Sequence, residues 1–337
     1  MLARREGVIT LKVCMVSGSY PPMKDGVGDY TQQLYDALRE RLGDEISLIT
    51  TETELSRDAQ ERGIWGIVRR WNCRALGTII KTLSTIRPDV VHIQYPAKGY
   101  RKRPEINLLP LILQLTFPRV RVVSTIHEFT NRSLLGKLRL LISIVFSDRV
   151  IIVDKWYARD IKKFWPFTAR KLVHIPVGAN IMPCHKHNGT EVKNWRERLG
   201  IAMEDFVMCF FGVIRAGKGI ELLLEAFRVV HSRYPHTKLL FIGRIDETYF
   251  DRSIKPIINE HEFSSSILVT GSCPAEAVSQ YFAISNICVL PFEDGVSTKR
   301  GSFMAALQHG LPIITTRGRF VPEGLMDREN VMLVDYG

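Results

Sequence analysis

The feature that most constrains this chain is a pattern that occurs once in each half: a short apolar strand, a glycine-containing loop and an amphipathic helix. The first copy begins with residues 11–17 and passes through a loop ending at Gly28 into a segment whose apolar residues recur every three to four positions. The second copy begins with residues 206–212 and leads into a helical pattern over residues 220–234. Strands and helices that alternate in this way indicate a parallel sheet with helices on both faces. We therefore predict two doubly wound α/β units.

Further apolar strand segments continue the alternation in both halves, and a polar stretch separates the two series. This stretch, residues 181–205, contains a proline, a histidine-rich run and many charges, as expected of a linker. A length of 337 residues also suits two domains of ordinary size. We predict an N-terminal Rossmann-like domain over residues 1–180, a linker over 181–205 and a C-terminal Rossmann-like domain over 206–337. The further predicted strands lie at residues 46–50, 90–94, 121–127, 149–154, 238–243, 266–271, 286–291 and 311–316.

The sequence argues against a membrane-spanning protein and offers little support for a metal site. The longest apolar stretches, residues 108–117 and 138–146, are shorter than the roughly 20 residues that a spanning helix requires. The six cysteines form no CxxC pair, which suits a reducing compartment, and we expect a cytoplasmic protein. Cys184, His185 and His187 have no fourth ligand at a suitable spacing, so we expect neither a metal nor another cofactor.

The excess positive charge of the chain is confined to its first half. Of a net charge of +11, residues 1–180 carry 29 Lys and Arg against 17 Asp and Glu, whereas residues 181–337 carry 17 against 18. Such a one-sided field commonly faces phosphate, nucleic acid or anionic lipid, although a solvated surface is the simpler interpretation. Nucleic acid is disfavoured because the sequence has no aromatic or groove-reading motif. An anionic membrane surface is therefore the candidate partner of the basic clusters Arg69-Arg70, Arg101-Lys102-Arg103 and Lys162-Lys163.

Two features of the first half point to a ligand at the carboxyl edge of its sheet. Gly26 and Gly28 stand at a helix start, where backbone amides approach an anion, although Thr31 replaces the third glycine of the dinucleotide fingerprint. A phosphate contact and a simple turn therefore both remain open. His127 ends a predicted strand on the same edge, where ligands bind in such sheets, and we expect it to be functional. A structural histidine is the alternative.

The second half contains two loops suited to a diphosphate. Gly212 opens the first, in which Arg215 and Lys218 precede a helix, but Gly219 stands where a P-loop needs Ser or Thr for magnesium. An NTPase is therefore disfavoured, while the two cations remain good ligands for a diphosphate. The second loop collects cations, a glycine and free amides at another helix start, or is simply a polar loop with Ser as the N-cap. Its candidate ligands are Ser297, Lys299, Arg300, Gly301 and Ser302, with the acids Glu293 and Asp294 nearby.

Taken in order, these motifs resemble glycosyltransferase family 4, the retaining, metal-independent sugar transferases of the GT-B fold. The resemblance covers nearly the whole chain, and the ordered set of motifs is specific. It implies two Rossmann-like domains that face a cleft, with the acceptor held mainly by the first and the nucleotide-sugar donor by the second. The matching segments are SYPPMKDGVGDYTQQLYDAL, PDVVHIQYP, STIHEF, DRVIIVDKWYARDI and IPVGANI in the first part, and FFGVIRAGKGIELLLEAF, LLFIGR, VTGSCPAEAVSQYFAISNICVLPF and AALQHGLPIITT in the second.

The resemblance implies a role for each candidate residue. Arg215 and Lys218 neutralise the leaving diphosphate in place of a metal ion, and His127 touches the transferred sugar. Gly26 and Gly28 lie against the donor phosphates or sugar. The remaining donor-binding candidates are Gly212, Ser297, Lys299, Arg300, Gly301 and Ser302.

The chain departs from the family pattern in two respects. The family has two glutamates eight positions apart beside the donor sugar and the ribose, but an alignment on His309-Gly310-Leu311-Pro312 places Ser297 and Ala305 there. Glu293 and Asp294 lie nearby and are candidate substitutes. Family members also continue past the last segment of this chain, so we expect the C-terminal domain to be incomplete.

These observations favour a glycosyltransferase that moves a sugar from a nucleoside diphosphate to a polysaccharide precursor or lipid-linked acceptor, at the inner face of a membrane. Two alternatives remain. The missing glutamates would suit a non-catalytic GT-B module that partners an active transferase. The glycine-rich loops would also suit another nucleotide-binding enzyme, such as an NTPase or a nucleotide-sugar epimerase. The donor sugar, its base, the linkage and the oligomeric state do not follow from the sequence.

Overall fold

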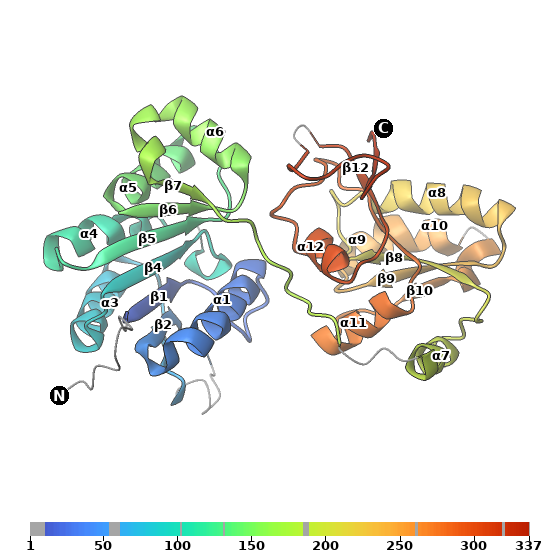
Figure 1. The fold of residues 1–337 in the computed structure, drawn as a ribbon, viewed down its shortest axis with the longest axis horizontal. Coiled ribbons are helices and arrows are strands. Elements are labelled where there is room, and N and C mark those ends of the chain that lie inside the picture. Colours follow the sequence, from blue (N-terminus) through green and yellow to red (C-terminus); the bar gives the residue numbers. More distant parts are fainter. Residues whose placement is uncertain are drawn as a thin grey trace. The chain divides into compact units, whose positions relative to one another are not determined.

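The chain divides into two compact units, Met1–Pro176 and Val177–Gly337, and each is built around its own parallel sheet (Figure 1). The stretch 181–205, which the sequence predicts as a linker, belongs to the second unit and contains helix α7 (Gly189–Arg198). The computed structural model describes residues 11–53, 61–101, 103–130, 132–184, 189–259, 262–318 and 321–336.

The first unit is built on a seven-stranded sheet in which all neighbouring strands are parallel. The strand order β3-β2-β1-β4-β5-β6-β7 reverses at β1, as in a doubly wound fold. The sequence predicted the five inner strands but not the two edge strands, because β7 has only three residues and β3 is interrupted by a glycine. The strands are β1 (Val13–Ser17), β2 (Ile46–Thr51), β3 (Ile64–Val68), β4 (Val90–Tyr95), β5 (Arg121–Ile126), β6 (Arg149–Ile152) and β7 (Leu172–His174).

Helices cover both faces of the first sheet (Figure 1). Three of them begin at a polar side chain that accepts hydrogen bonds from amides of the first turn: Asn72, Ser133 and Asp154. These caps fix where each helix starts after the preceding loop. The main helices of this unit are α1 (Gly26–Leu42), α3 (Cys73–Ile86), α4 (Leu109–Thr116), α5 (Leu134–Phe146) and α6 (Lys155–Phe164).

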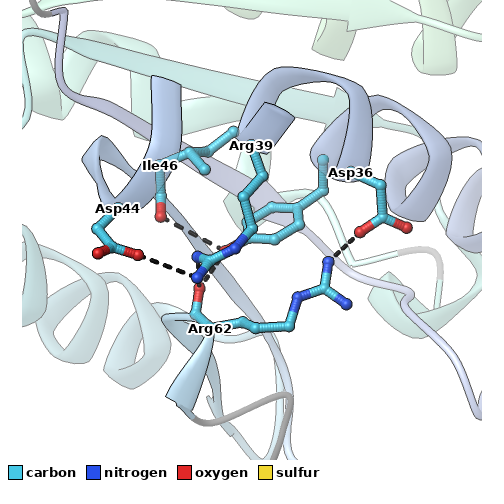
Figure 2. Close-up of polar contacts among 6 residues, drawn as sticks. Asp36, Arg39, Asp44, Ile46 and Arg62 are labelled. Carbon is cyan, nitrogen blue, oxygen red and sulfur yellow. Dashed lines mark hydrogen bonds and ion pairs between the residues drawn. The ribbon is translucent and has the colours of Figure 1, made fainter. Parts of the chain in front are cut away.

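Helix α1 is fixed to the edge of the sheet by a buried tyrosine and two arginines (Figure 2). Tyr35 is completely buried, and its hydroxyl donates to the backbone oxygen of Arg62, two residues before β3. Arg39 donates to the same oxygen at 2.9 Å and to Asp44 at 3.0 Å, while the side chain of Arg62 pairs with Asp36. These contacts fix the position of α1, which begins at Gly26 and includes Gly28, the two glycines predicted to approach a ligand.

The second unit is built on a six-stranded parallel sheet with the order β10-β9-β8-β11-β12-β13. It reverses at β8, so it repeats the winding of the first unit. The sequence predicted all but the three-residue edge strand β13. The strands are β8 (Phe206–Phe211), β9 (Thr237–Ile242), β10 (Ile267–Val269), β11 (Ile287–Leu290), β12 (Ile313–Thr316) and β13 (Met332–Val334).

A single apolar core joins the helices of the second unit to its sheet. Helix α8 (Ile220–Arg233) buries Leu223, Leu224 and Phe227 against the strands, as its predicted amphipathic pattern requires. Together, the two parallel sheets confirm the predicted α/β fold class. No helix in the described part of the chain is both long and apolar enough to cross a bilayer. The other helices are α9 (Glu247–Tyr249), α10 (Lys255–Asn259), α11 (Ala275–Ala283) and α12 (Gly301–Gln308).

Candidate active site

The predicted site residues lie at the carboxyl ends of the parallel strands, where ligands bind in this type of sheet. Three of them, Gly26, Gly28 and His127, belong to the first unit. The others lie in the second unit, in the loops that follow β8 and β11 or at the helix starts behind them: Gly212, Arg215, Lys218, Glu293, Asp294, Ser297, Lys299, Arg300, Gly301 and Ser302.

Glycine allows the two loops of the second unit to pack on one another. Gly219, at the start of α8, has a φ of +67°, and a Cβ atom there would lie 2.0 Å from the backbone oxygen of Pro291. Gly217 has a φ of +80°, and its Cβ position lies 3.9 Å from the carboxylate of Glu293. Only glycine fits position 219 without displacing the neighbouring loop. The two loops that the sequence predicts separately as diphosphate ligands therefore lie side by side.

One cation from each loop lies against a buried aromatic ring. Phe292 follows β11 and is completely buried. The Nζ atom of Lys218 lies 5.1 Å from the centre of this ring, and the Cζ atom of Arg300 lies 4.4 Å from it. Both distances are within the range of cation–π attraction. Asp294 forms an ion pair with Arg300, so one of the two acids predicted near the site contacts it directly.

Three other cations lie close enough to Lys218 to affect its pKa. The pKa of Lys218 is lowered to about 8, first by burial and then by the positive charges of Arg300, Arg215 and Lys299. We call these four residues the cationic cluster. A bound anion would oppose this lowering, because negative charge beside Lys218 favours its protonated form. The electrostatics of the cluster thus suit a ligand with more than one negative charge, such as a diphosphate.

The second predicted acid, Glu293, lies among aromatic hydroxyls. Burial raises the pKa values of Tyr249 and Tyr336, and the carboxylates of Glu221 and Glu293 contribute to both shifts. The side chain of Asp294 instead pairs with Arg300. Of the two acids, Asp294 is thus the one engaged with the cationic cluster.

Helix α12 starts at the cationic cluster. Its N-cap is Arg300, which makes no side-chain capping hydrogen bond within the described chain, and Gly301 and Ser302 are its first two residues. The simpler interpretation of this loop, in which a serine is the N-cap, is therefore wrong. The first amides of α12 face the loop without a capping side chain, as at many anion-binding helix starts.

Two further side chains at this helix start are relevant, and the first was not singled out from the sequence. The Oδ1 atom of Asn180 lies 3.5 Å from the Cβ position of Gly301. This oxygen and the Oγ atom of Ser297 are buried and have no hydrogen-bond partner among the described residues. Buried polar atoms are normally hydrogen-bonded, so both oxygens are candidates for ligand contact. The only sequence signal for Asn180 was its place in the segment IPVGANI, and that for Phe292 was its place at the end of the segment VTGSCPAEAVSQYFAISNICVLPF.

In the first unit, His127 ends a chain of buried polar side chains that crosses β4 and β5. Its Nε2 atom lies 2.9 Å from Oε1 of Gln94, and the amide nitrogen of Gln94 lies 3.2 Å from Nε2 of His92. The hydroxyl of Thr125 completes the chain at 2.7 Å from the same nitrogen of His92. With Oε1 of Gln94 as acceptor, His127 carries its proton on Nε2, which leaves Nδ1 as an acceptor. The edge of the Tyr30 ring lies against the imidazole, with ring centres 4.7 Å apart.

His127 and His92 are both neutral at pH 7. The pKa of His127 is lowered to about 3, chiefly by burial and also by His92, while Asp25 opposes the shift. Burial alone lowers the pKa of His92 to about 4. His127 therefore offers a neutral, oriented imidazole rather than a positive charge.

The start of α1 differs from the cationic cluster in its charge. Gly28 packs tightly, because its Cβ position lies 3.3 Å from the Cβ atom of Ser19, whereas the Cβ position of Gly26 has open space around it. Asp25 is the N-cap and accepts a hydrogen bond from the backbone amide of Lys98 at 2.8 Å. Asp29 lies in the first turn, and its pKa is raised by burial and then by Asp25. Two carboxylates at this helix start make it less suited to a phosphate than the start of α12.

Comparisons with known proteins identify the family of the chain. Residues 24–181 match the model described as Glycosyltransferase Family 4, and residues 191–337 match the model described as Glycosyl transferases group 1. The chain is a family 4-like glycosyltransferase with the GT-B fold. A curated relative of this glycosyltransferase is the alpha-monoglucosyldiacylglycerol synthase of Acholeplasma laidlawii, which is 28% identical over 329 residues, covering 90% of this chain and 80% of the relative.

Solved structures show the same fold at low sequence identity. A glycosyltransferase from Rickettsia africae has a TM-score of 0.76 and 15% identity, over 98% of this chain and 85% of the other. Anabaena HepE in complex with UDP-glucose has a TM-score of 0.71 and 13% identity, over 97% and 86%. Of the three hypotheses raised by the sequence, the two family models and the curated relative support the glycosyltransferase.

No group of three or more metal-ligating side chains occurs within the described ranges. Of the cysteine and histidines that the sequence analysis considered as ligands, His185 and His187 lie outside the described residues.

Proposed function

We propose that this glycosyltransferase moves a sugar, with retention of configuration and without a bound metal ion, from a nucleoside diphosphate to a lipid-linked or polysaccharide-precursor acceptor. The observation that carries the proposal is the cationic cluster. Lys218 and Arg300 lie on opposite loops of the second unit, yet both contact the ring of Phe292. The pKa of Lys218 is lowered to about 8 by burial and by neighbouring cations, so an unfavourable positive potential exists there before a ligand arrives.

The chemical task of this cluster is to stabilise the departing diphosphate. During transfer, the bond between the anomeric carbon and the diphosphate oxygen breaks, and the acceptor oxygen bonds to that carbon. The acceptor proton leaves with the released diphosphate. Preorganised cations lower the energy of the negative charge that develops on the leaving group, which is the task a metal ion performs in other transferases. Arg215, Lys218, Lys299 and Arg300 supply that charge in our proposal.

Further donor contacts follow from the same loops. The buried oxygens of Asn180 and Ser297, together with the amides of Gly301 and Ser302, are proposed to bind the sugar and the phosphates. Gly212 has a φ of +147° after β8, and its Cβ position lies 4.0 Å from the side chain of Ser302, so the backbone runs close to the donor loop.

The first unit is proposed to present hydrogen-bonding groups without positive charge to the sugar. The Nδ1 atom of His127 is an acceptor for a sugar hydroxyl, because Nε2 is engaged with Gln94. Gly26 leaves open space at the helix start, and Asp25 and Asp29 make a sugar hydroxyl a better partner there than a phosphate.

The named relatives support a particular donor and acceptor class. One structural relative was crystallised with UDP-glucose, and the curated relative is named for the synthesis of a glucosylated diacylglycerol. We therefore propose UDP-sugars as the first donors to test and a glycolipid precursor as the first acceptor. The proposed location is the cytoplasmic face of a membrane, reached peripherally.

Thermal stabilisation by nucleotides tests the donor site. The full chain is heated with UDP, GDP, ADP or their sugar conjugates, with either magnesium or EDTA. A ligand at a hundred times its Kd should add about 2.7 kcal/mol to the free energy of unfolding. We expect one nucleotide class to stabilise the chain equally in magnesium and in EDTA. The absence of any shift, or a shift that requires magnesium, would contradict the proposal.

The stereochemical part needs a separate measurement. Incubation with the stabilising nucleotide sugar and a lipid acceptor should give a product whose anomeric proton coupling matches that of the donor. A product of inverted configuration would contradict retention while leaving donor binding intact.

A further inference from the structure

An exposed surface of the first unit combines large apolar side chains with lysines. It is formed by the first turns of α5, the end of α6 and the residues just after it. Leu134 is 67% exposed and Phe167 is 69% exposed, so these side chains are largely in water. We call this surface the apolar–basic patch, and its members are Leu134, Leu135, Lys137, Leu138, Lys162, Lys163, Phe164 and Phe167.

Contacts around Phe129 show that the two helix ends lie together. The Nζ atom of Lys137 on α5 lies 4.8 Å from the centre of the Phe164 ring on α6 and 5.5 Å from that of Phe129. Phe129 is completely buried, and its ring centre lies 6.5 Å from that of Phe164. The patch is therefore one continuous surface rather than two separate exposed segments.

The apolar part of the patch is too concentrated to be ordinary surface. Single exposed leucines are common, but adjacent large apolar side chains in water mark a binding surface. Leu134, Leu135 and Leu138 lie within five positions at the start of α5, and the helix buries Leu140 and Ile144 further along. The first turns of α5 are thus apolar without covering the core.

The charge of the two segments that form the patch is mostly positive. Residues 128–139 and 155–167 contain seven Lys and Arg against Glu128 and Asp160. Both acids already have a partner: Glu128 pairs with Arg132, and Asp160 accepts a hydrogen bond from Thr130. The partner of the patch must therefore accept apolar side chains and supply negative charge. An anionic lipid bilayer has both properties, since leucine and phenylalanine enter the acyl boundary while lysines meet the headgroups.

The patch also lies at the same edge of the first sheet as His127. Phe129 follows His127 by two residues, and Ser133 caps α5 after the same loop. Both the patch and His127 therefore belong to the carboxyl edge of the sheet of the first unit, the unit in which the resemblance places most of the acceptor site. We propose that the apolar–basic patch docks the first unit on an anionic bilayer. Its use in presenting a lipid-linked acceptor rests on the proposed function, but the docking itself does not.

Vesicle flotation of the full chain tests this surface. The vesicles contain phosphatidylcholine alone or a mixture with phosphatidylglycerol. We expect binding to the mixture only, weakening with salt. The triple variant Leu134→Ser, Leu135→Ser, Leu138→Ser should lose at least tenfold in binding. Neutralising Lys137, Lys162 and Lys163 to Gln should cost about fivefold for each lysine.

A matched control removes exposed apolar surface from the other unit. Val229 and Tyr234 are 62% and 61% exposed, and changing both to Ser should leave flotation unchanged. Equal binding of the triple leucine variant and the wild type would overturn the docking surface. A wild-type dimer that dissociates in that variant, without vesicle binding, would overturn it in favour of contact between copies.

Stabilisation by nucleotides separates this inference from the proposed function. Every patch variant should be stabilised by the same nucleotide as the wild type, which also shows that the variant is folded. If the wild type binds nucleotide but does not float with anionic vesicles, only the docking surface is contradicted. If the wild type floats but binds no nucleotide, only the donor site is contradicted.

Discussion

The two units share one winding of a parallel sheet, yet the charges at their carboxyl edges are opposite in character. The first unit carries the excess of basic residues, but its site contains a neutral His127 and the carboxylates Asp25 and Asp29. The second unit is nearly neutral as a whole, but three cations lie near Lys218, and Lys218 and Arg300 both contact Phe292. Net charge therefore describes the surface that a unit shows to large partners, whereas the local potential at a site depends on which few side chains the fold brings together.

The largest expected effect is the loss of activity when Lys218 of the cationic cluster, rather than a lysine elsewhere in the unit, loses its charge. Lys218→Met keeps an apolar chain on Phe292 but removes the charge, so transfer should fall about 10²- to 10³-fold in kcat/KM. Steady-state kinetics with the stabilising nucleotide sugar measure this. Lys255→Met, on α10 beside Asp251, is the matched control and should keep full activity. If Lys218→Met retained wild-type kinetics, the cluster would not stabilise the leaving group.

Glycine replacements test whether the two helix starts are built differently. Gly219→Ala forces a Cβ atom to 2.0 Å from the oxygen of Pro291 at a φ of +67°, and should cost about 2–3 kcal/mol of unfolding free energy. Gly26→Ala enters open space at the first residue of α1 and should change stability by less than about 1 kcal/mol. Urea denaturation compares the two variants. Similar costs at both positions would remove this distinction between the loops.

The pH dependence of nucleotide binding should distinguish the units as well. Because Lys218 has a pKa of about 8 in the free protein, diphosphate affinity should fall about tenfold between pH 7 and 9 as its charge is lost. Lys218→Arg stays protonated and should flatten that profile. His127, with a pKa of about 3, should contribute no titration between pH 5 and 8. Calorimetric titration with a nucleoside diphosphate across this pH range, on the wild type and on Lys218→Arg, measures these effects.

The same lysine has a defined effect on stability. Its pKa in the folded chain lies below the ordinary value of 10.5, so between about pH 8 and 10.5 the unfolded chain binds more protons. The contribution of Lys218 to the free energy of unfolding therefore rises with pH across this window. A flat contribution, measured as the difference between wild type and Lys218→Met, would contradict the lowered pKa.

A further prediction concerns the tyrosine that fixes α1 to the edge of the sheet. Tyr35→Phe removes the hydroxyl that donates to the backbone oxygen of Arg62 and should cost about 1–2 kcal/mol in urea unfolding. Nucleotide binding should be unchanged, because the donor loops lie in the other unit. Tyr234→Phe, at an exposed position, is the control and should have no measurable effect.

Local patterns were sufficient to predict most of the fold. The five inner strands of the first sheet and five of the six in the second follow from short apolar runs, since a strand buried on both faces must be apolar throughout. The edge strands β3, β7 and β13 were not predicted, because β3 is interrupted by a glycine and β7 and β13 have only three residues each. The stretch 181–205 has the composition of a linker, but the packing of α7 against α11 includes it in the second unit.

The candidate site was predictable only in its parts. The sequence alone determined that two parallel sheets would form and that glycine and cations would stand at their helix starts, because these features depend on residues close together in the chain. Only the tertiary structure decided that Lys218 and Arg300, 82 positions apart, meet on Phe292, that Asp294 pairs with Arg300, and that His127 is neutral. The physical reason is that pKa values and cation–π contacts depend on burial and on distances through space.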